Sequence, residues 1–351
     1  MIDFSTLYPP PDNYKRQDGS SRFCFMTFVM RNDAFIPGAL VFAYALKNLN
    51  TQADVVCMVT KEVSSQARSA LDFLFDKVIV VDEVFIPHER RQERQDRPYL
   101  FTRFQSLLTG SDGPLGWHYE KVVMTDADVL PLASYDHLFT LPAPAGIINE
   151  FKANSMEYDL KGNYIIPDSL RENGKWIWHK IYEPVCPHGT KVPLFLTDRV
   201  KNDQKNMGIN SSIWVITPSV ETYNKIFSEI SNPEMDVLVR EKFNWPEMQF
   251  ATLFWSGQWT SIDLRFSSFN GYPSLDVLCG THFAGYKPWN FKESGTISRF
   301  SRFPDYNLWH KTFVSLMEEF PQLNGIPKLS RLRKNIKSLN AENRKTAFDK
   351  K

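Results

Sequence analysis

The sequence predicts an α/β protein in which a mainly parallel sheet is flanked by helices. Short apolar runs, such as residues 23–30 and 54–60, alternate with segments whose apolar residues recur at helical spacing, such as residues 38–46 and 64–75. In this kind of alternation, each helix carries the chain back to begin the next parallel strand. With 351 residues, of which 42% are hydrophobic, the chain can bury one large core or two modest ones.

Most elements have a local signal of their own. The run at residues 23–30 is short and apolar, and Pro37 stands in the first turn of the helix that follows it. Ser219, with Glu221 behind it, is a typical N-cap for a helix that runs to about residue 230. Further strands are expected at residues 54–60, at 78–81, just before residue 126 and at 213–216, and further helices at residues 64–75, at 102–108 and from residue 247.

A pair of carboxylates interrupts the apolar run at residues 122–132. At the end of an extended strand, residues two apart point the same way, so Asp126 and Asp128 would present both carboxylates on one side. Ala127 between them is small enough for a ligand to approach the backbone. Hard oxygen ligands suit Mg²⁺ or Mn²⁺, which keep open positions for the oxygens of a substrate diphosphate. The alternative is a solvated turn that binds no metal.

Other polar residues are candidate partners of these two aspartates. Ligands of open parallel sheets lie beyond the carboxyl ends of the strands, so residues 31–33, after the first strand, are expected to share a crevice with the aspartates. Further along the chain, His282 could bind a metal while Lys287 meets a phosphate. Arg103 lies off the apolar stripe of its segment, and helical spacing leaves open whether it faces solvent or turns inward to an anion.

Charge and cysteine usage exclude several classes of protein. A formal net charge of +1 argues against a nucleic-acid binder built on a global positive field. That balance hides a contrast, because residues 328–351 hold nine basic residues against two acidic ones, which leaves −6 for residues 1–327. The cysteines are widely spaced and form no Cys-x-x-Cys pair, so we expect reduced core residues at Cys24, Cys57, Cys186 and Cys279.

No segment near the N-terminus is typical of export or membrane insertion. Residues 1–14 hold three consecutive prolines and an aspartate where a signal peptide needs a basic start and an apolar centre. The apolar run at residues 23–30 is far shorter than the roughly 20 residues of a membrane span. We therefore expect a soluble, cytoplasmic protein.

The organisation that we expect has one main domain. An N-terminal extension covers residues 1–21, the α/β domain covers residues 22–300, and a helical basic tail covers residues 301–351. The polar, tryptophan-containing stretch at about residues 151–206 interrupts the α/β pattern, and we interpret it as an insertion such as a lid.

The tail has two interpretations. Its apolar residues recur at three- and four-residue spacings among lysines and arginines, at Leu329, Leu332, Ile336 and Leu339. A basic amphipathic helix of this kind suits an anionic membrane surface or an acidic partner. Alternatively, the helix packs its apolar stripe on the main domain and frays after Ala341.

Four segments, taken in order, resemble a known family. They are Asn-Asp-Ala-Phe-Ile-Pro-Gly-Ala-Leu-Val at residues 32–41, Met-Thr-Asp-Ala-Asp-Val-Leu at 124–130, Ile-Asn-Ser-Ser-Ile-Trp-Val at 209–215 and His-Phe-Ala-Gly-Tyr-Lys-Pro-Trp-Asn at 282–290. Over about residues 23–292 the chain thus resembles glycosyltransferase family 8, the glycogenin-like retaining transferases. The resemblance implies a GT-A fold, a Rossmann-like domain that binds a UDP-sugar with Mn²⁺, or with Mg²⁺. It also implies transfer of a hexose, with glucose or galactose favoured, to a hydroxyl acceptor on a glycan, a protein or a small molecule.

The resemblance assigns the donor site position by position. The implied metal ligands are Asp126, Asp128 and His282. The positions that fall where the family holds the uridine are Val29, Arg31, Asn32 and Phe35, and Ala127 would contribute its backbone to the nucleotide. Gly285 and Lys287 resemble the pair that binds the diphosphate.

The side that faces the transferred sugar matches the family less closely. Arg103 falls where glycogenin has a lysine near the sugar, and Asn210 and Ser211 match polar residues that contact it. Glycogenin has an Asp-Gln pair near the reacting carbon, whereas this chain has Glu247-Met248-Gln249. Either Glu247 replaces the carboxylate, which we favour, or Gln249 alone keeps the position.

Self-priming, non-catalytic binding and nucleotidyl transfer are alternatives to this hypothesis. The chain has no secure match to the tyrosine that glycogenin glucosylates on itself, so self-priming is not implied. A non-catalytic module that binds a nucleotide-sugar or a glycan is the alternative to an enzyme. A sugar-1-phosphate nucleotidyltransferase would want an N-terminal glycine-rich phosphate loop, which residues 31–34 do not form.

Overall fold

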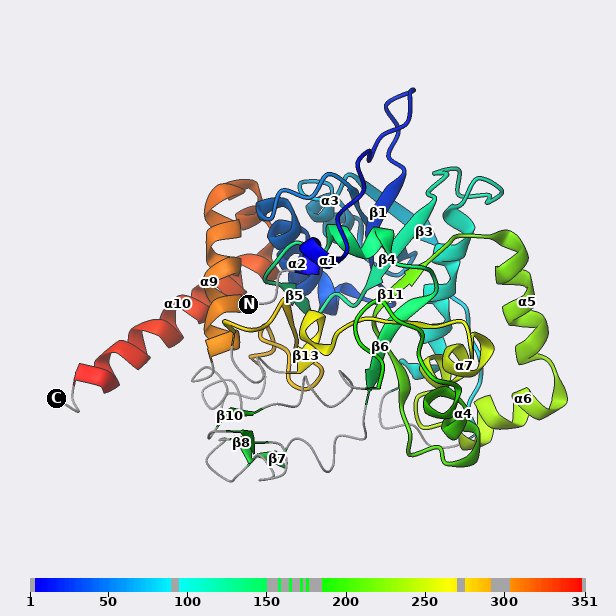
Figure 1. Cartoon of the computed structure of the whole chain (residues 1–351). Helices are drawn as coiled ribbons and strands as arrows, with labels where there is room; N and C mark the ends of the chain where they lie inside the picture. Colours follow the sequence, from blue (N-terminus) through cyan, green and yellow to red (C-terminus); the bar gives the residue numbers. More distant parts are fainter. Residues whose placement is uncertain are drawn as a thin grey trace.

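The computed structural model describes residues 4–89, 95–149, 185–269, 275–291 and 304–348, together with four two-residue strands between residues 157 and 176 (Figure 1). Of the 56 residues of the expected insertion at about residues 151–206, 26 lie outside the described residues, as do residues 90–94 and 270–274. The short strands form two antiparallel pairs, β7 (Glu157–Tyr158) with β8 (Tyr164–Ile165) and β9 (Arg171–Glu172) with β10 (Lys175–Trp176).

A seven-stranded sheet forms the centre of the protein. All its strands run in the same direction except β11, which is antiparallel to both of its neighbours. The predicted mainly parallel sheet is therefore confirmed. In spatial order the strands are β12 (Thr260–Ser261), β6 (Ala145–Asn149), β11 (Gly208–Ile216), β4 (Lys121–Thr125), β1 (Phe23–Val29), β2 (Asp54–Thr60) and β3 (Lys77–Val81).

Helices cover both faces of this sheet (Figure 1). One core lies under α2 (Ile36–Asn48), α3 (Ser65–Leu71), α9 (Pro304–Glu319) and α10 (Pro327–Phe348). The other lies under η2 (Arg97–Thr109), α4 (Leu194–Asn202), α5 (Val220–Ile230) and α7 (Pro246–Phe254). The remaining helical segments are α1 (Phe4–Leu7), η1 (Asp33–Phe35), η3 (Asp136–Thr140), α6 (Pro233–Val237), η7 (Leu238–Lys242), η8 (Leu264–Phe266) and η9 (Pro321–Gly325).

The strand sequences explain this two-sided covering. In β1, Phe25 and Val29 belong to the first core, whereas Cys24 and Met26 belong to the second. Successive side chains of a strand point to opposite faces, so a strand that is covered on both sides must be apolar at every position. This is why the strands are continuous apolar runs in the sequence rather than alternating ones.

Several local expectations are confirmed and one is wrong. Ser219 caps α5, because its hydroxyl accepts a hydrogen bond from the Thr222 N–H at 3.2 Å. All four cysteines are buried and none is part of a disulfide. The segment at residues 102–108, however, is a 3₁₀-helix that is buried nearly all round, so Arg103 and Gln105 are buried together with the apolar residues of their segment.

The first residues of the chain pack onto the main domain. Phe4 is buried against the rings of His188 and Phe266, with ring centroids 4.7 and 5.1 Å away. The Tyr8 hydroxyl donates a hydrogen bond to the backbone carbonyl of His188 at 2.9 Å. The segment therefore contributes its aromatic side chains to the first core.

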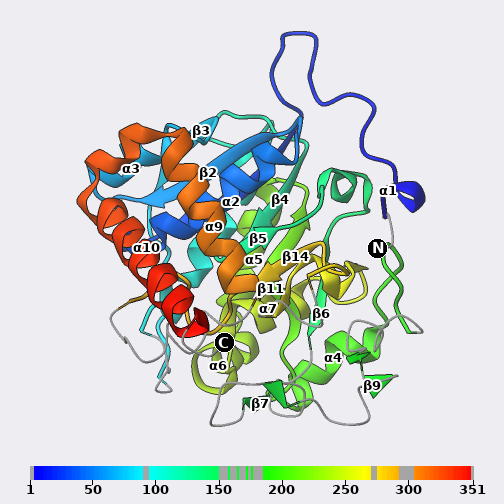
Figure 2. The ribbon, with the colours of Figure 1, turned by 90° about the vertical axis from the view of Figure 1, so that its left-hand side faces the viewer.

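The C-terminal helix packs its apolar stripe on the domain. Figure 2 shows α10 beside α9 in front of the sheet. Leu329, Leu332 and Ile336 belong to the first core, and Leu339 is also buried. Contact with a membrane or an acidic partner through this stripe is not supported, because the stripe already covers the core. Among the described helices, every one is too short or too polar to cross a bilayer.

We predict that α10 contributes to the stability of the fold. Ile336→Ala should lower the free energy of unfolding by about 2–5 kcal/mol, since it removes a fully buried side chain and leaves a cavity. Lys334→Ala, on the exposed face of the same helix, should change it by less than about 0.5 kcal/mol. Urea melts of both variants test this, and equal stabilities would show that α10 is not part of the cooperative unit.

Candidate active site

A cleft of about 650 Å³ opens at the carboxyl ends of β1 and β4. The residues after β1 and the two aspartates after β4 line it together, which confirms the crevice expected from the strand order. The sequence-predicted residues that line it are Val29, Arg31, Asn32, Phe35, Arg103, Asp126, Ala127, Asp128, Asn210, Ser211, Glu247 and His282.

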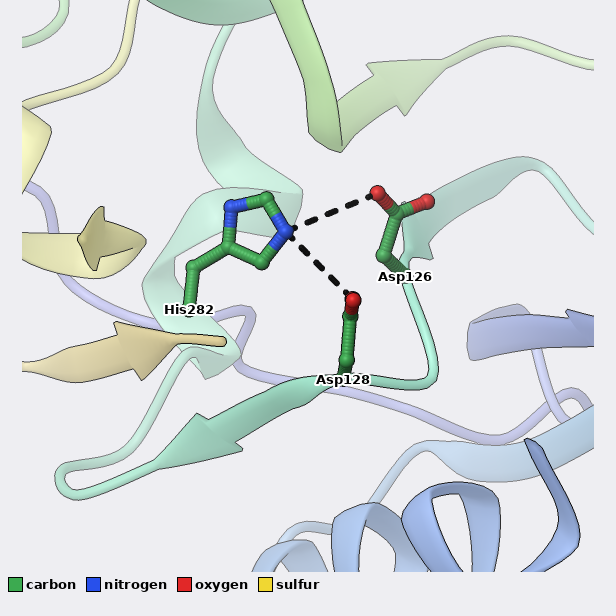
Figure 3. Close-up of side chains that lie close together, drawn as sticks. All are labelled: Asp126, Asp128 and His282. Carbon is green, nitrogen blue, oxygen red and sulfur yellow. Dashed lines mark ion pairs between the residues drawn. The ribbon is translucent and has the colours of Figure 1, made fainter. Parts of the chain in front are cut away.

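Asp126, Asp128 and His282 converge at one wall of this cleft (Figure 3). His282 Nε2 lies 3.3 Å from Asp128 Oδ1 and 3.9 Å from Asp126 Oδ2. One ligand atom from each residue can be chosen so that all three lie within 4.8 Å of one another. Two carboxylates and an imidazole at this spacing fit a divalent cation of the Mn²⁺ or Mg²⁺ type.

The local backbone differs from the extended strand end that the sequence suggested. β4 ends at Thr125, and the Val129 N–H donates to the Asp126 carbonyl at 3.2 Å, which makes residues 126–129 a turn. The two carboxylates meet because the turn folds them together.

A small second sheet brings His282 to this turn. β5 (Val129–Pro131) pairs with β14 (Gly280–His282), which also pairs with β13 (Ser268–Phe269). In this register His282 lies opposite Val129, and the Phe283 N–H donates to the Asp128 carbonyl at 2.9 Å. The pairing therefore fixes the imidazole beside the aspartates, although more than 150 residues separate them in the sequence.

Lys287 adds a positive charge behind the cluster. Its ammonium group donates to Asp128 Oδ2 and, at 2.6 Å, to the Phe283 carbonyl. Burial alone would raise the pKa of Asp128, but Lys287 and His282 outweigh burial and hold the pKa well below its ordinary value. Asp128 is therefore held as a carboxylate, able to bind a cation, at neutral pH.

Arg103 turns inward and joins two walls of the cleft. Its Nη2 donates to Asp126 Oδ1 at 2.9 Å, and its Nη1 donates to the Ser211 carbonyl at 2.6 Å. The guanidinium group lies 5.1 Å from the ring centroids of both Phe28 and Trp214. The structure thus decides between the two orientations that spacing left open.

Glu247 is the carboxyl group of the opposite wall. Its Oε1 accepts a hydrogen bond from the Ser211 hydroxyl at 3.3 Å, while its buried Oε2 finds no hydrogen-bond partner in another described residue. Burial raises the pKa of Glu247, with Arg103 opposing that shift and Asp126 adding to it. The group therefore lies at the cleft as a buried carboxyl whose Oε2 is not hydrogen-bonded to another described residue.

Gln249 lies elsewhere. Its side chain is fully buried, and it bonds to three backbone groups of neighbouring loops rather than lining the cleft. Of the described candidates, Gly285 and Lys287 also fall outside the cleft lining, although Lys287 reaches Asp128 from behind.

Sequence reasoning missed one part of the cleft. The additional lining residues come from the start of η2, from the start of β11 and from the start of α7, and they include Gln95, Asp96, Arg97, Leu100, Met207, Trp245 and Met248. None follows a parallel strand, so the strand-end rule does not reach them. Asp96, Arg97 and Trp245 are half-buried, and no local pattern in the sequence marks them as cleft residues.

Comparisons with known proteins agree with this geometry. The uncharacterized protein R707 of Acanthamoeba polyphaga mimivirus is 25% identical over 321 residues, which cover 86% of this chain and 96% of that protein. Human glycogenin-1 is 26% identical over 315 residues, which cover 85% of this chain and 71% of that protein. This similarity over most of the chain supports a glycogenin-like glycosyltransferase.

The similarity to glycogenins supports an enzyme, and the mainly parallel sheet flanked by helices is the α/β architecture that the resemblance implied. No family model matches the chain. Among solved structures, the galactosyltransferase LgtC with donor and acceptor sugar analogues aligns with a TM-score of 0.44 at 14% identity, covering 79% of this chain and 94% of that one.

We predict that Gly38 of this transferase keeps the metal cluster in place. A Cβ at this position of α2 would lie 2.3 Å from the Ala127 carbonyl oxygen and 2.5 Å from the Trp289 ring, so Gly38→Ala must displace the turn between the two aspartates. Titration with Mn²⁺ should show roughly 10-fold weaker binding, the size of effect that a displaced support has on metal ligands.

The matched control is Gly325→Ala, where an added Cβ meets nothing within 4 Å. Alanine favours a helix over glycine by about 1 kcal/mol, so helix propensity alone would make the Gly38→Ala variant more stable than the original protein. Unchanged Mn²⁺ affinity in Gly38→Ala would mean that the turn can move without loss.

Proposed function

We propose that this glycosyltransferase moves a hexose, glucose or galactose, from a UDP-sugar to a hydroxyl acceptor in a Mn²⁺- or Mg²⁺-dependent reaction that retains the anomeric configuration. The observation that carries the proposal is the convergence of Asp126, Asp128 and His282 at the wall of a cleft that the residues after β1 also line. The family places a nucleotide-sugar and its metal at the same positions.

The residues present suit the implied cation. Carboxylate oxygens match Mg²⁺ and Mn²⁺, and an imidazole ligand favours Mn²⁺ of the two. When bound, the cation would neutralise the donor diphosphate and the negative charge that grows on it as the sugar leaves. Without it, each pair of like charges at 4 Å would cost about 4 kcal/mol at an effective dielectric of 20.

The chain's own residues supply the rest of the donor site. Val29, Arg31, Asn32 and Phe35 are proposed to hold the uridine, with the backbone of Ala127 beside it. Gly285 and Lys287 are proposed to bind the diphosphate, Lys287 from its position on Asp128. A second positive charge there stabilises the leaving group without any proton transfer.

Glu247 is the residue we propose beside the reacting carbon. The bond from the anomeric carbon to the diphosphate oxygen breaks, and the acceptor oxygen forms the new bond on the same face while its proton passes to the leaving diphosphate. A carboxylate at Glu247 Oε2 would stabilise the positive charge on the sugar. Arg103, which lies between Asp126 and the Ser211 carbonyl, favours the ionised form of Glu247. Asn210 and Ser211 are proposed to contact the sugar.

Asp128→Asn should reduce release of UDP from UDP-glucose or UDP-galactose on the order of 100-fold or more, because it removes a charged ligand of the cluster without touching the core. His282→Ala should cost less, since both carboxylates remain. Turnover and a thermal melt on the same sample measure activity and fold together. Asp72→Asn, at the exposed end of α3, is the matched control. Normal activity of Asp128→Asn would refute the metal site.

Glu247→Gln should lower kcat for hexose transfer by about 100-fold while the donor KM stays within about 3-fold, because the carboxylate acts on the charge of the transition state. Glu241→Gln, an exposed glutamate near the same helix, should leave both constants unchanged. If Glu247→Gln keeps a normal kcat, Glu247 has no part in the chemistry.

A further inference from the structure

We infer that the part of the cleft around Trp245 is an acceptor subsite for a carbohydrate. The Trp245 indole is its stacking surface, and Gln249 is the residue that positions Trp245. This inference rests on the proposed function, because it names the class of molecule whose hydroxyl receives the hexose.

Trp245 is connected to the metal cluster through a short chain of contacts. Arg103 links Asp126 to the Ser211 carbonyl, and the Ser211 hydroxyl donates to Glu247. Glu247 is in the first turn of α7, and Trp245 is the N-cap residue of that helix. Trp245 therefore lines the cleft beside the carboxyl group proposed to lie at the reacting carbon, where an acceptor must be held.

The surface around Trp245 has two kinds of side chain. Met207 and Met248 are buried to 4% exposure and form an apolar floor, whereas Asp96 and Arg97 line the same part of the cleft from η2. Arg97 is held in place by its Nη1, which donates to the Asn244 carbonyl at 2.6 Å. An aromatic surface next to a carboxylate and a guanidinium group is thus presented to any bound acceptor.

A sugar ring has the chemistry that matches this surface. Its C–H face carries slight positive charge and suits the negative face of an indole, while its hydroxyl edge can bond to a carboxylate and a guanidinium group. A lipid chain would desolvate Asp96 and Arg97 without replacing their hydrogen bonds, which is costly. A tyrosine side chain would stack as well but offers one hydroxyl, which the transfer itself consumes.

Gln249 holds the backbone of Trp245 in place. Its Oε1 accepts from the backbone N–H of Trp245 at 2.8 Å, and its Nε2 donates to the Gln204 carbonyl at 2.9 Å and to the Asn206 carbonyl at 2.7 Å. The amide thus ties the start of α7 to the loop that leads into Met207. Gln249 does not itself line the cleft, so it is a positioning residue for the wall that carries Trp245 and Met207.

The test uses the full chain with Mn²⁺ and separates donor from acceptor. Binding and slow hydrolysis of UDP-glucose and UDP-galactose are measured first, without acceptor. Transfer is then measured to maltose, lactose and N-acetyl-tyrosinamide. Absence of donor binding and hydrolysis would refute the proposed function itself, whereas normal donor cleavage with no transfer to either disaccharide would refute only the carbohydrate subsite.

Trp245→Ala should raise the KM of the accepted disaccharide by roughly 10-fold or more, while Trp245→Phe, which keeps an aromatic face, should stay within about 3-fold. Trp117→Ala is the matched control, because this exposed tryptophan lies at the opposite edge of the sheet and stacks only on Lys77 in the described contacts. An unchanged acceptor KM in Trp245→Ala, or transfer to N-acetyl-tyrosinamide that exceeds transfer to both disaccharides, would overturn the inference.

A double variant tests the positioning role. Gln249→Leu should raise the disaccharide KM with little change in donor binding, and Trp245→Ala with Gln249→Leu should be no worse than Trp245→Ala alone, since both act through the same ring. Additive losses in acceptor KM would show that Gln249 does not act through Trp245. A thermal melt of each variant confirms that the compared proteins are folded.

Discussion

One buried guanidinium group connects the parts of the active site. Arg103 is 3% exposed, bonds to an aspartate of the metal cluster with one nitrogen and to the backbone of β11 with another, and is enclosed by the rings of Phe28 and Trp214. An unpaired charge in such a place would be strongly unfavourable, so Arg103 and Asp126 stabilise one another only while β4 and β11 keep their register. The geometry of the site is therefore coupled to the integrity of the central sheet.

The parts of the fold that could be predicted are those fixed by neighbours in sequence. β1 and β2 are recognisable because both of their faces are buried, and α5 because Ser219 caps it. The candidate metal ligands Asp126 and Asp128 could be singled out because they interrupt an apolar run. His282 could be named as a possible ligand from its sequence, but its place beside the aspartates depends on the pairing of β14 with β5, which no local pattern shows.

The parts that could not be predicted depend on which side of an element faces inward. Glu247 and Gln249 are two residues apart on a helix, which rotates by about 100° per residue, so they cannot both face the cleft. Sequence alone did not say which side of α7 lies there, and the structure places Glu247 at the cleft and Gln249 against the loops behind it. The packing partner of the C-terminal helix was ambiguous for the same reason, since the same spacing of apolar residues is expected whether the helix packs on a bilayer or on a protein core.

The reversed direction of β11 has a consequence for how this site can change. Because β11 runs against its neighbours, its beginning, with Asn210 and Ser211, lies beside Asp126 at the edge where the parallel strands end, and the Asp126 N–H bonds to the Ser212 carbonyl at 3.0 Å. The ladder of β11 with β6 shifts register between Asn210 and Trp214, so Ser211 and Ser212 lie at an irregularity within this wall. A bulge re-aims the side chains beside it, so a change of one residue in the length of this segment would turn different side chains toward the cleft while the flanking ladder stays paired.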